Sequence, residues 1–507
     1  MEEVVAKVDE FEDGDMREVE VGDVTVLLVR LEGQFYAVGG ECTHFGAPLA
    51  DGVIHNGSVR CPWHQACFDA TSGELEEPPA LDALSKFKAR VEADEVIVTV
   101  PDGAKNESLP DMVEQDLEGD GRVFVIIGGG AAGHSAAESL RQSGFQGEIK
   151  LLTAGDHPPY DRTQLSKYNM ANDSDRLPAL RSEEFYEEAD VQLLTGQEVT
   201  GLEVDGKKVT LSDGQTLNYD RLLIATGASP NELPVPGKEL ENVFTLREPE
   251  DLKKINQKAE SSANVTIIGS SFIGMEAASS LSGRDLDVTV VSLTKAPFEN
   301  VLGEKIGEVY QATHSENGVN FEMESSVKSF KGNGVIEEVE LESGKTIPSD
   351  FVIMGVGVRP ATGFLKDSLE LNEDGGVPVD EHLRVTEDIY AAGDVASFRD
   401  WRTDDEIRVE HWRLAQQQGR VAGKNMAGQA TKFRSLPLFW TNQFDIYLRY
   451  VGYADDWDEI VFDGDPSSKE FIAYYVSDGE VVAIAGSNSN LEMAALAELM
   501  EEGQIPD

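Results

Sequence analysis

Cysteine, positive charge and long apolar runs are all scarce in this chain of 507 residues. Its three cysteines fall between Cys42 and Cys67, so no disulfide framework exists, which favours a reducing compartment. The chain has 42 Lys plus Arg against 94 Asp plus Glu, and a net charge of -52 argues against nucleic acid or anionic lipid as a partner. No stretch reaches the roughly 18 apolar residues of a membrane span, and the start lacks signal-peptide features. We therefore expect a soluble, cytoplasmic protein.

The acidic excess is spread through every segment and is not confined to a tail. Self-repulsion on this scale destabilises the compact state at low salt. We interpret the charge as adaptation to a salty, halophilic cytoplasm, with an acidic docking face as the alternative.

The length predicts three or four domains, because it exceeds what one hydrophobic core usually serves. Residues 1–100 carry short alternating apolar runs broken by Asp-Gly and Glu-Gly pairs, a pattern typical of a small antiparallel all-β domain. Residues 101–121 are polar, acidic and without apolar periodicity, so we predict a solvated linker.

Two copies of a Cys-then-His loop lie in the first domain and indicate a metal site. The first holds Cys42 and His44, and the second holds Cys61 and His64. Two thiolates and two imidazoles also describe a structural zinc site, but zinc usually takes a Cys pair followed by a His pair. One ligand of each kind per loop matches a Rieske 2Fe-2S centre, in which both Cys bind one iron and both His the other.

Along its whole length the segment 42–68 resembles the Rieske ferredoxin family. That resemblance implies that a high-potential member would carry a disulfide where this chain has Ala47 and Trp63, and hydroxyl groups where it has Ala66 and Phe68. Fewer hydrogen bonds to the sulfurs stabilise the reduced cluster less, so we expect a low-potential, ferredoxin-like centre with an exposed His edge for a partner. The third cysteine, Cys67, has no thiol partner and is expected to be a small buried residue.

From Arg122 the pattern changes to a buried strand, 123–127, that runs into Gly128, Gly130 and Gly133 and then a helical stretch. This is the dinucleotide fingerprint in its strand-turn-helix context. The glycines allow a tight turn, a close approach to a pyrophosphate and close helix packing, and phosphate charge lies at the helix N-terminus. The next strand ends near Asp156, an acid suited to an adenosine ribose.

A second fingerprint, Gly269 to Gly274, follows the strand 265–268 and predicts a second dinucleotide. Ser271 takes the place of the middle glycine. The next strand ends at Ser292, where an NAD site usually has a carboxylate for the ribose 2'-hydroxyl. Without that acid a 2'-phosphate is not repelled, and Lys295 is near enough in sequence to pair with one; a simple solvated loop lysine is the alternative.

Three further segments are Leu223 to Gly227, Gly355 to Pro360 and Tyr390 to Asp394. With them, the chain from about Arg122 onward resembles the FAD- and pyridine-nucleotide-dependent reductases of the ferredoxin reductase and apoptosis-inducing-factor type, and the whole chain resembles their subgroup with an N-terminal Rieske module. The resemblance implies FAD at the first fingerprint and NADH or NADPH at the second. No Cys pair follows the first fingerprint, so disulfide reductase, peroxidase and thiol-dependent oxidase mechanisms are excluded.

The resemblance also implies individual roles. Lys167 lies beside the flavin, where a carboxylate can pair with it, and Glu276 lies beside the nicotinamide; these are the two candidate catalytic residues. Arg162 contacts the FAD diphosphate or adenosine, and Asp394 the ribityl region. The full set assigned to cofactor binding is Gly128, Gly130, Ala132, Gly133, Asp156, Arg162, Lys167, Val199, Thr226, Gly227, Gly269, Ser271, Phe272, Ile273, Gly274, Glu276, Ser292, Lys295, Gly357, Gly393, Asp394, Glu410, His411 and Trp412.

These observations predict a multidomain architecture with two Rossmann-like α/β domains. We expect a first FAD part at 122–240, an inserted NAD(P)H domain at 241–362 and a second FAD part at 363–430. Residues 431–507 show alternating runs and a final helical stretch, which predict an α+β closing domain.

The resemblance implies an NAD(P)H-dependent electron-transfer enzyme, a monomer or homodimer, that passes electrons through FAD to its own Rieske cluster and on to a separate oxygenase or cytochrome. Two alternatives stay open. One is an NAD(P)H-sensing signalling protein of the apoptosis-inducing-factor kind. The other is a component of a nitrite-reducing system, although no further Cys set for a sirohaem centre is present.

Overall fold

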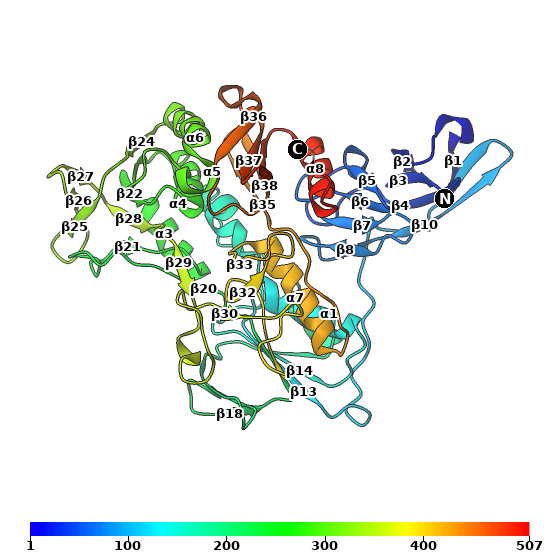
Figure 1. The fold of residues 1–507 in the computed structure, drawn as a ribbon, viewed down its shortest axis with the longest axis horizontal. Helices are drawn as coiled ribbons and strands as arrows, with labels where there is room; N and C mark the ends of the chain where they lie inside the picture. Colours follow the sequence, from blue (N-terminus) through cyan, green and yellow to red (C-terminus); the bar gives the residue numbers. More distant parts are fainter. Residues whose placement is uncertain (506–507) are drawn as a thin grey trace.

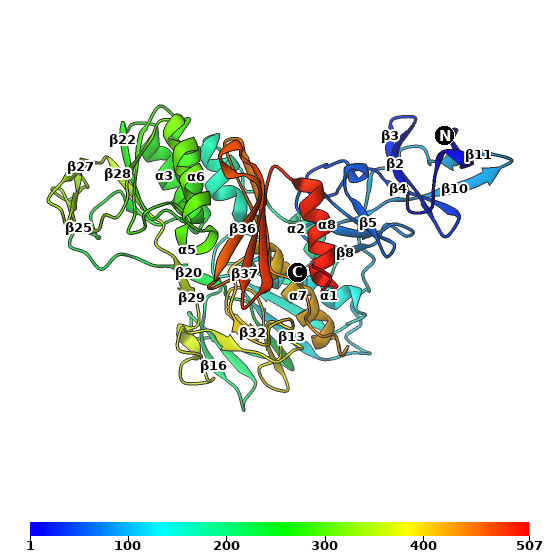
Figure 2. The same cartoon turned by 45° about the horizontal axis from the view of Figure 1, so that its top comes forward.

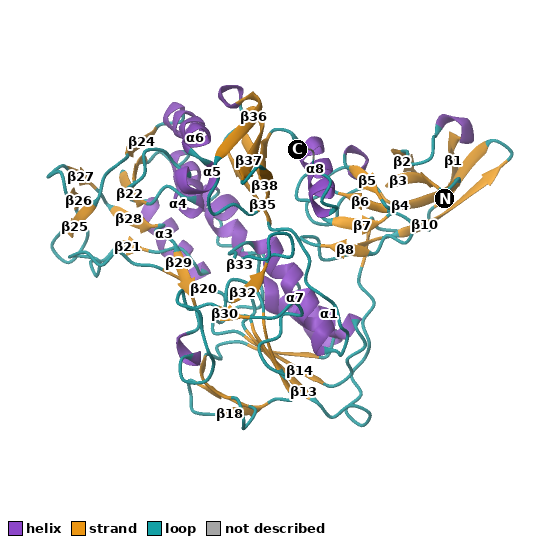
Figure 3. Cartoon of the chain, viewed as in Figure 1, coloured by secondary structure: helices purple, strands orange, loops and turns teal. Residues whose placement is uncertain are grey.

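The computed structural model describes residues 1–505 and has the expected multidomain architecture of one all-β domain, two α/β domains and an α+β closing domain (Figure 1; Figure 3). Within those residues, every helix falls short of the length and apolarity that a bilayer span needs.

The N-terminal domain is built on a six-stranded antiparallel sheet in the order β1-β11-β10-β4-β3-β2. A four-stranded antiparallel sheet, β5-β6-β7-β8, is inserted between β4 and β10 and carries the second Cys-His loop. The strands are β1 (Glu2–Lys7), β2 (Met16–Val21), β3 (Val24–Leu31), β4 (Gln34–Gly39), β5 (Val53–His55), β6 (Ser58–Arg60), β7 (Cys67–Asp69), β8 (Leu75–Glu77), β10 (Lys86–Glu92) and β11 (Glu95–Thr99).

Strand β3 is apolar in every position of its centre because both faces of the sheet are covered. Successive side chains of a strand point to opposite faces. Leu27 and Val29 pack in one core cluster with Cys42 and Cys61, whereas Val26 and Leu28 pack in the other cluster of the domain. One face of the sheet therefore packs against the two Cys-His loops.

The segment 101–121 connects the first two domains and is more firmly attached than a solvated linker would be. Its strand β12 (Glu107–Ser108) pairs with β9 (Ala83–Leu84). The Asn106 side chain donates to the carbonyl of Glu41 and accepts from its amide, beside the first loop. Further on, the amide of Asp116 donates to the carbonyl of Gln146 at 2.9 Å.

The first α/β domain has a five-stranded parallel sheet in the order β15-β14-β13-β19-β31. Its strands are β13 (Val123–Ile127), β14 (Glu148–Leu152), β15 (Val191–Leu194), β19 (Arg221–Ile224) and β31 (Ile389–Ala391), and its helices are α1 (Ala131–Gln142), α2 (Glu183–Glu188) and α7 (Trp412–Met426). Small sheets at its edge are formed by β16 (Val199–Glu203), β17 (Lys208–Leu211) and β18 (Thr216–Asn218), and by β30 (Val377–Pro378), β32 (Ala396–Arg399) and β33 (Glu406–Ile407).

The second α/β domain is inserted into the first and repeats its plan, with a parallel sheet in the order β21-β28-β22-β23-β24. Its main elements are β21 (Val243–Phe244), α3 (Pro249–Ala259), β22 (Asn264–Ile268), α4 (Phe272–Ser282), β23 (Asp287–Val291), α5 (Glu299–Leu302), α6 (Glu304–Glu316), β24 (Val319–Glu322) and β28 (Phe351–Met354). An antiparallel sheet of β25 (Val327–Lys331), β26 (Glu338–Leu341) and β27 (Thr346–Pro348) lies at its edge, and β20 (Ala228–Pro230) pairs with β29 (Val358–Pro360) where the chain crosses between the domains.

The closing domain lies between the second α/β domain and the N-terminal domain. Its antiparallel sheet has the order β34-β35-β38-β37-β36, formed by β34 (Leu438–Gln443), β35 (Ile446–Gly452), β36 (Glu459–Asp465), β37 (Glu470–Ser477) and β38 (Glu480–Ser487). One face shares a hydrophobic core with α4 and α6, and the other is covered by the helix α8 (Asn490–Glu501). In both orientations α8 lies between this sheet and the strands β5 to β8 (Figure 1; Figure 2).

Candidate functional site

The two Cys-His loops have the same backbone geometry. In the first, the amide of Cys42 donates to the carbonyl of Ala47 at 2.8 Å; in the second, the amide of Cys61 donates to the carbonyl of Ala66 at 2.8 Å. The first loop turns at Gly46 (φ +73°), and the second turns at the equivalent position, Gln65 (φ +59°). The two loops therefore share one backbone turn, although His44 is two residues after its Cys and His64 is three residues after its Cys.

The four donor side chains form one sulfur pair and one nitrogen pair. The Nδ1 atoms of His44 and His64 lie 3.1 Å apart. The thiols of Cys42 and Cys61 are within hydrogen-bonding reach, and this contact lowers the pKa of Cys61. Burial lowers the pKa of His44 to about 3, so the imidazole is in its neutral, metal-binding form. Two thiol donors and two imidazole donors fit a Rieske cluster, with one pair for each iron.

The residues around the donors agree with the sequence interpretation. Ala47, Ala66 and Phe68 are at most 1% exposed, and none carries a hydroxyl group. Cys67 is 3% exposed, and burial raises the pKa of its thiol to about 12, so it is an inert buried residue.

The expectation of an exposed His edge is wrong for His64, whereas His44 is partly exposed. His64 is only 7% exposed. Its ring lies 4.5 Å, centroid to centroid, from the indole of Trp440 on β34. The His44 ring is 6.1 Å from the same indole. His64 is covered because the closing domain packs against it, which no feature of the loops alone reveals.

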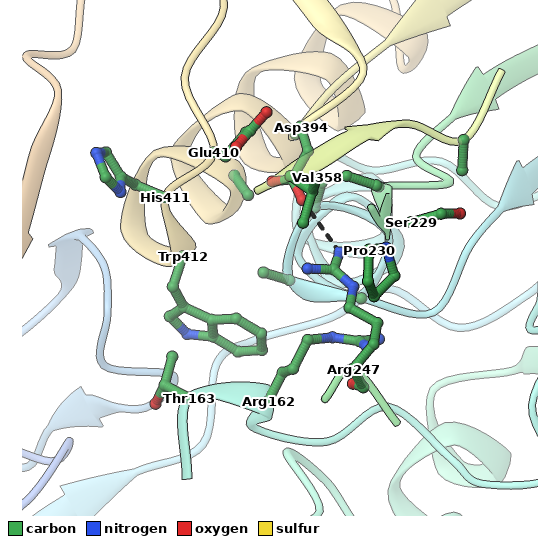
Figure 4. A pocket seen from close by; sticks show the side chains of 18 of the residues that line it. Arg162, Thr163, Ser229, Pro230, Arg247, Val358, Asp394, Glu410, His411 and Trp412 are labelled. Atoms are coloured by element: carbon green, nitrogen blue, oxygen red, sulfur yellow. Dashed lines mark hydrogen bonds and ion pairs between the residues drawn. The ribbon is translucent and has the colours of Figure 1, made fainter. Parts of the chain in front are cut away.

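A cavity of about 1030 Å³ lies where the two α/β domains and the closing domain meet. Most of the predicted cofactor residues line it: Gly128, Gly130, Ala132, Arg162, Lys167, Val199, Thr226, Gly227, Ser271, Phe272, Ile273, Glu276, Gly357, Gly393, Asp394, Glu410, His411 and Trp412. Figure 4 shows Glu410, His411 and Trp412 leading into α7, and Arg162 and Arg247 below them in the view.

The first glycine fingerprint forms a cradle at the N-terminus of α1, which begins at Ala131 directly after the turn. A Cβ on Gly133 would lie 1.8 Å from the carbonyl oxygen of Gly128, so this glycine allows helix and strand to pack. A Cβ on Gly130 would meet no protein atom within 4 Å and would point into open space. The cradle thus leaves room beside a helix N-terminus for a pyrophosphate, which fits FAD.

The two candidate catalytic residues form an ion pair in the cavity wall. Lys167 Nζ lies 3.1 Å from Glu276 Oε1, and Glu276 is 5% exposed. The carboxylate also accepts hydrogen bonds from Ser166 at 2.6 Å and from Thr441 at 2.9 Å. Glu276 therefore ties together the loop after β14, the helix α4 and the closing domain.

Other cavity residues have no motif that sequence analysis could recognise. Arg247 pairs with Asp394 at 3.1 Å, the contact drawn as a dashed line in Figure 4. The ring of Phe439 contacts that of His411, with the centroids 4.5 Å apart and the planes tilted by 32°. Burial lowers the pKa of His411 to about 4, so this ring is neutral at pH 7. Phe439 and Trp440 are adjacent aromatic residues at the start of the closing domain, and this pair is the one signal for them in the sequence.

Six predicted residues do not line the cavity. Gly133, Gly269 and Gly274 act in the turns, where a Cβ on Gly274 would meet the carbonyl oxygen of Gly269 at 2.1 Å. Asp156 is exposed at the end of β14. Ser292 is buried, and its hydroxyl accepts from Ser270 at 2.7 Å and lies 3.0 Å from that of Thr294. Lys295 is exposed, with its Nζ 3.9 Å from Glu304.

Buried arginines join the N-terminal domain to the rest of the chain. Arg60 pairs with Glu498 and with Glu501 at 2.7 Å on α8. Arg181 pairs with Asp82 at 2.6 Å and with Glu138 on α1 at 2.7 Å. From α7, Arg413 donates to the carbonyl of Gln65 at 3.2 Å, and from β35, Arg449 donates to the carbonyl of Trp63 at 2.8 Å. The second Cys-His loop is therefore fixed against two other domains.

Three consecutive segments of the chain each match a known protein family. Residues 122–419 match the family described as pyridine nucleotide-disulphide oxidoreductase. Residues 2–88 match the Rieske [2Fe-2S] domain, and residues 438–507 match the reductase C-terminal domain.

Individual relatives extend over most of the chain. Apoptosis-inducing factor 3 of Homo sapiens is 38% identical over 514 residues, covering 99% of this chain and 84% of the relative. The benzene 1,2-dioxygenase system ferredoxin--NAD(+) reductase subunit of Pseudomonas putida is 30% identical over 381 residues, covering 75% of this chain and 92% of the relative. Among solved structures, the covalent putidaredoxin reductase-putidaredoxin complex aligns with a TM-score of 0.72 at 29% identity, covering 75% of this chain and 93% of that one.

Proposed function

Because this chain belongs to the pyridine nucleotide-disulphide oxidoreductase family and carries a Rieske domain before it and a reductase C-terminal domain after it, we propose that it is a self-contained ferredoxin-type reductase. It takes electrons from NADH or NADPH through FAD to its own Rieske 2Fe-2S cluster, and from there to a separate redox protein. The sequence interpretation of fold, cofactors and enzyme class is confirmed by these matches.

FAD, when bound, accepts a hydride from the nicotinamide and releases single electrons, which is the conversion that a one-electron cluster requires. The chain positions these groups. Gly128, Gly130 and the N-terminus of α1 would hold the pyrophosphate of FAD. The Lys167–Glu276 ion pair places a fixed cation and a fixed carboxylate in the cavity wall. Ser166 and Thr441 keep that carboxylate in one orientation, because both donate to it.

The observation that carries this proposal is the position of Trp440. Its indole lines the cavity on one side and contacts the ring of His64 on the other, 4.5 Å between centroids. A cluster ligand and the flavin cavity are thus separated by a single side chain. A cluster bound in the Rieske domain would therefore lie close enough to accept electrons from a flavin in the cavity.

Stopped-flow reduction by NADH or NADPH without oxygen tests the proposal. We expect rapid flavin reduction followed by cluster reduction in the same molecule. Trp440→Leu is expected to slow the second phase by about tenfold or more, because it removes the contact between cavity and ligand, and to leave the first phase unchanged. Trp401→Leu, which changes a half-exposed tryptophan, is the matched control. A flavin that reduces slowly and leaves the cluster oxidised would instead support the signalling alternative.

An external acceptor, an oxygenase or a cytochrome in our proposal, has to approach the cluster from the side that the closing domain leaves open. Phe45 is 51% exposed and its ring lies 3.9 Å from that of His44. Trp63, between the second pair of ligands, is 37% exposed. We propose that these two side chains mark the exit side of the cluster.

The donor preference is decided at the end of β23. Ser292 stands where a carboxylate would favour NADH, and the hydroxyl groups of Ser270, Ser292 and Thr294 contact one another there. We expect Ser292→Glu to lower the ratio of kcat/KM for NADPH to that for NADH by about tenfold or more, because the new carboxylate repels a 2'-phosphate and accepts from a 2'-hydroxyl. Initial rates with both donors measure the ratio, with Ser282→Glu, at the far end of α4, as the control. An unchanged ratio would contradict the assignment of this subsite.

A further inference from the structure

The strands β34 and β35 of the closing domain present two neighbouring side chains to the second cluster loop. Trp440 and Arg449 are directly opposite each other in this antiparallel pair. The Trp440 ring contacts His64, and Arg449 Nε donates to the carbonyl of Trp63 at 2.8 Å. The residue that accepts this hydrogen bond lies between the ligands Cys61 and His64. The guanidinium is therefore held next to the cluster site by a domain that follows it by hundreds of residues.

Arg449 differs in its charge balance from three other arginines of the interface. Arg60, Arg181 and Arg413 each have a carboxylate within 4 Å, on Glu498, Asp82 and Glu77. Arg449 is 3% exposed, and within residues 1–505 no carboxylate lies within ion-pair distance of it. Its second donor contact is to the neutral amide oxygen of Asn442 at 3.2 Å.

A buried guanidinium without an opposite charge is costly unless its N–H groups are hydrogen-bonded, and Arg449 has two acceptors, the carbonyl of Trp63 and the side-chain amide oxygen of Asn442. In a chain with 94 acidic residues, a carboxylate could have been supplied from many positions. The main acceptor of Arg449, the carbonyl of Trp63, belongs to the loop between the cluster ligands Cys61 and His64. A negative charge that could compensate Arg449 would therefore lie on the cluster side of the interface.

We propose that Arg449 is the electrostatic partner of the Rieske cluster and stabilises its reduced form. The oxidised cluster with two cysteinate ligands has no net charge, and the electron that arrives from reduced FAD gives it one negative charge. A fixed positive charge therefore favours the reduced state selectively. With Ala66 and Phe68 in place of hydroxyl donors, the closing domain supplies part of the stabilisation that the cluster loops lack. The inference concerns the cluster alone and does not depend on the identity of the external acceptor.

The size of the effect follows from Coulomb's law. At an effective dielectric constant of about 20, two unit charges about 10 Å apart change an equilibrium constant by about tenfold. For a one-electron couple, a tenfold change in the ratio of reduced to oxidised cluster equals about 59 mV.

A redox titration of the full-length holoprotein at pH 7 and fixed ionic strength, followed by the cluster EPR signal, tests the proposal. We expect Arg449→Gln to lower the reduced-to-oxidised ratio at a given potential by about tenfold, whereas Arg449→Lys, which keeps the charge, stays within about threefold of the wild type. Asn442→Asp leaves the guanidinium in place and gives it a carboxylate partner, so it is expected to lower the ratio as well. Because Asn442 is exposed, Asn442→Asp is expected to fold, so its ratio of reduced to oxidised cluster can be measured even where Arg449→Gln fails to fold.

Asn333→Asp, which adds one exposed carboxylate to the distant β25–β26 turn, is the matched control and is expected to leave the ratio unchanged. Wild-type ratios in Arg449→Gln and in Asn442→Asp would overturn the proposal. The proposal would also be overturned if Arg449→Lys lowered the ratio of reduced to oxidised cluster as much as Arg449→Gln does. The hydrogen-bonding geometry of the side chain, and not its charge, would then set the potential.

Discussion

His64→Cys will abolish the Rieske-type EPR signal and lower electron delivery to an external acceptor by more than about 100-fold, while NAD(P)H continues to reduce the flavin at close to the wild-type rate. The imidazole donors define the electronic structure of the His-ligated iron, so a third thiolate changes the cluster type. Mutation of a residue that only hydrogen-bonds to a metal ligand typically lowers metal affinity or activity by about 10–100-fold. The loss of a direct ligand should therefore lower electron delivery by more than that. Flavin reduction is spared because the Lys167–Glu276 pair and the glycine cradle do not contact His64.

EPR of the reduced protein and single-turnover reduction by NADH or NADPH measure the two effects separately, and His44→Cys should behave in the same way. His55→Cys is the control, because His55 lies in the same domain but pairs with Glu502 away from the loops. A Rieske signal that survives would remove His64 from the ligand set. Flavin reduction that collapses with the signal would mean that the contact through Trp440 also holds the nicotinamide half of the cavity in shape.

Gly133→Ala will produce a protein with little or no FAD. The added Cβ would lie 1.8 Å from the carbonyl oxygen of Gly128 and 3.2 Å from Cγ2 of Ile126, so α1 has to move away from β13. Overpacking of a core costs about 1–3 kcal/mol or more, which corresponds to about tenfold to more than a hundredfold weaker binding if the strain falls on the cradle. FAD content after purification and reconstitution measure the effect.

Two other glycines separate local strain from direct exclusion of the cofactor. The Cβ of Gly130→Ala would have no protein atom within 4 Å, so the unfolding temperature of the FAD-free protein should not change. FAD binding should weaken, because the methyl group would point to the site of the pyrophosphate. Gly283→Ala, at the end of α4, also meets no atom within 4 Å and should change neither property. Normal FAD content in Gly133→Ala would show that the first fingerprint is not the FAD site.

Local motifs were predictable because their chemistry is encoded within a few adjacent residues. The two Cys-His loops need only a turn and a pair of donors, and the strand 123–127 with its glycines needs only a tight turn before a helix. The sequence interpretation placed both, and it identified Lys167 and Glu276 separately, each in its own motif. The helices α1 and α4 begin directly at the glycine turns, at Ala131 and Phe272.

The arrangement of these motifs is what tertiary structure decided. The Lys167–Glu276 ion pair joins segments 109 positions apart only because the second α/β domain folds back over the first. The burial of His64 and the contacts of Trp440 and Arg449 with its loop depend on complementary surfaces of separate domains, for which a single sequence has no periodicity or spacing signal.

The sequence by itself determined which cofactors this chain can hold, because ligand types and glycine turns are local requirements of the backbone. Only the tertiary structure decided that the cluster faces inward, toward the flavin cavity, and that a buried arginine from the closing domain lies beside it. The physical reason is that docking free energy is the sum of many weak contacts and a few buried charges, such as those of Arg60, Arg181 and Arg449, brought together from distant parts of the chain.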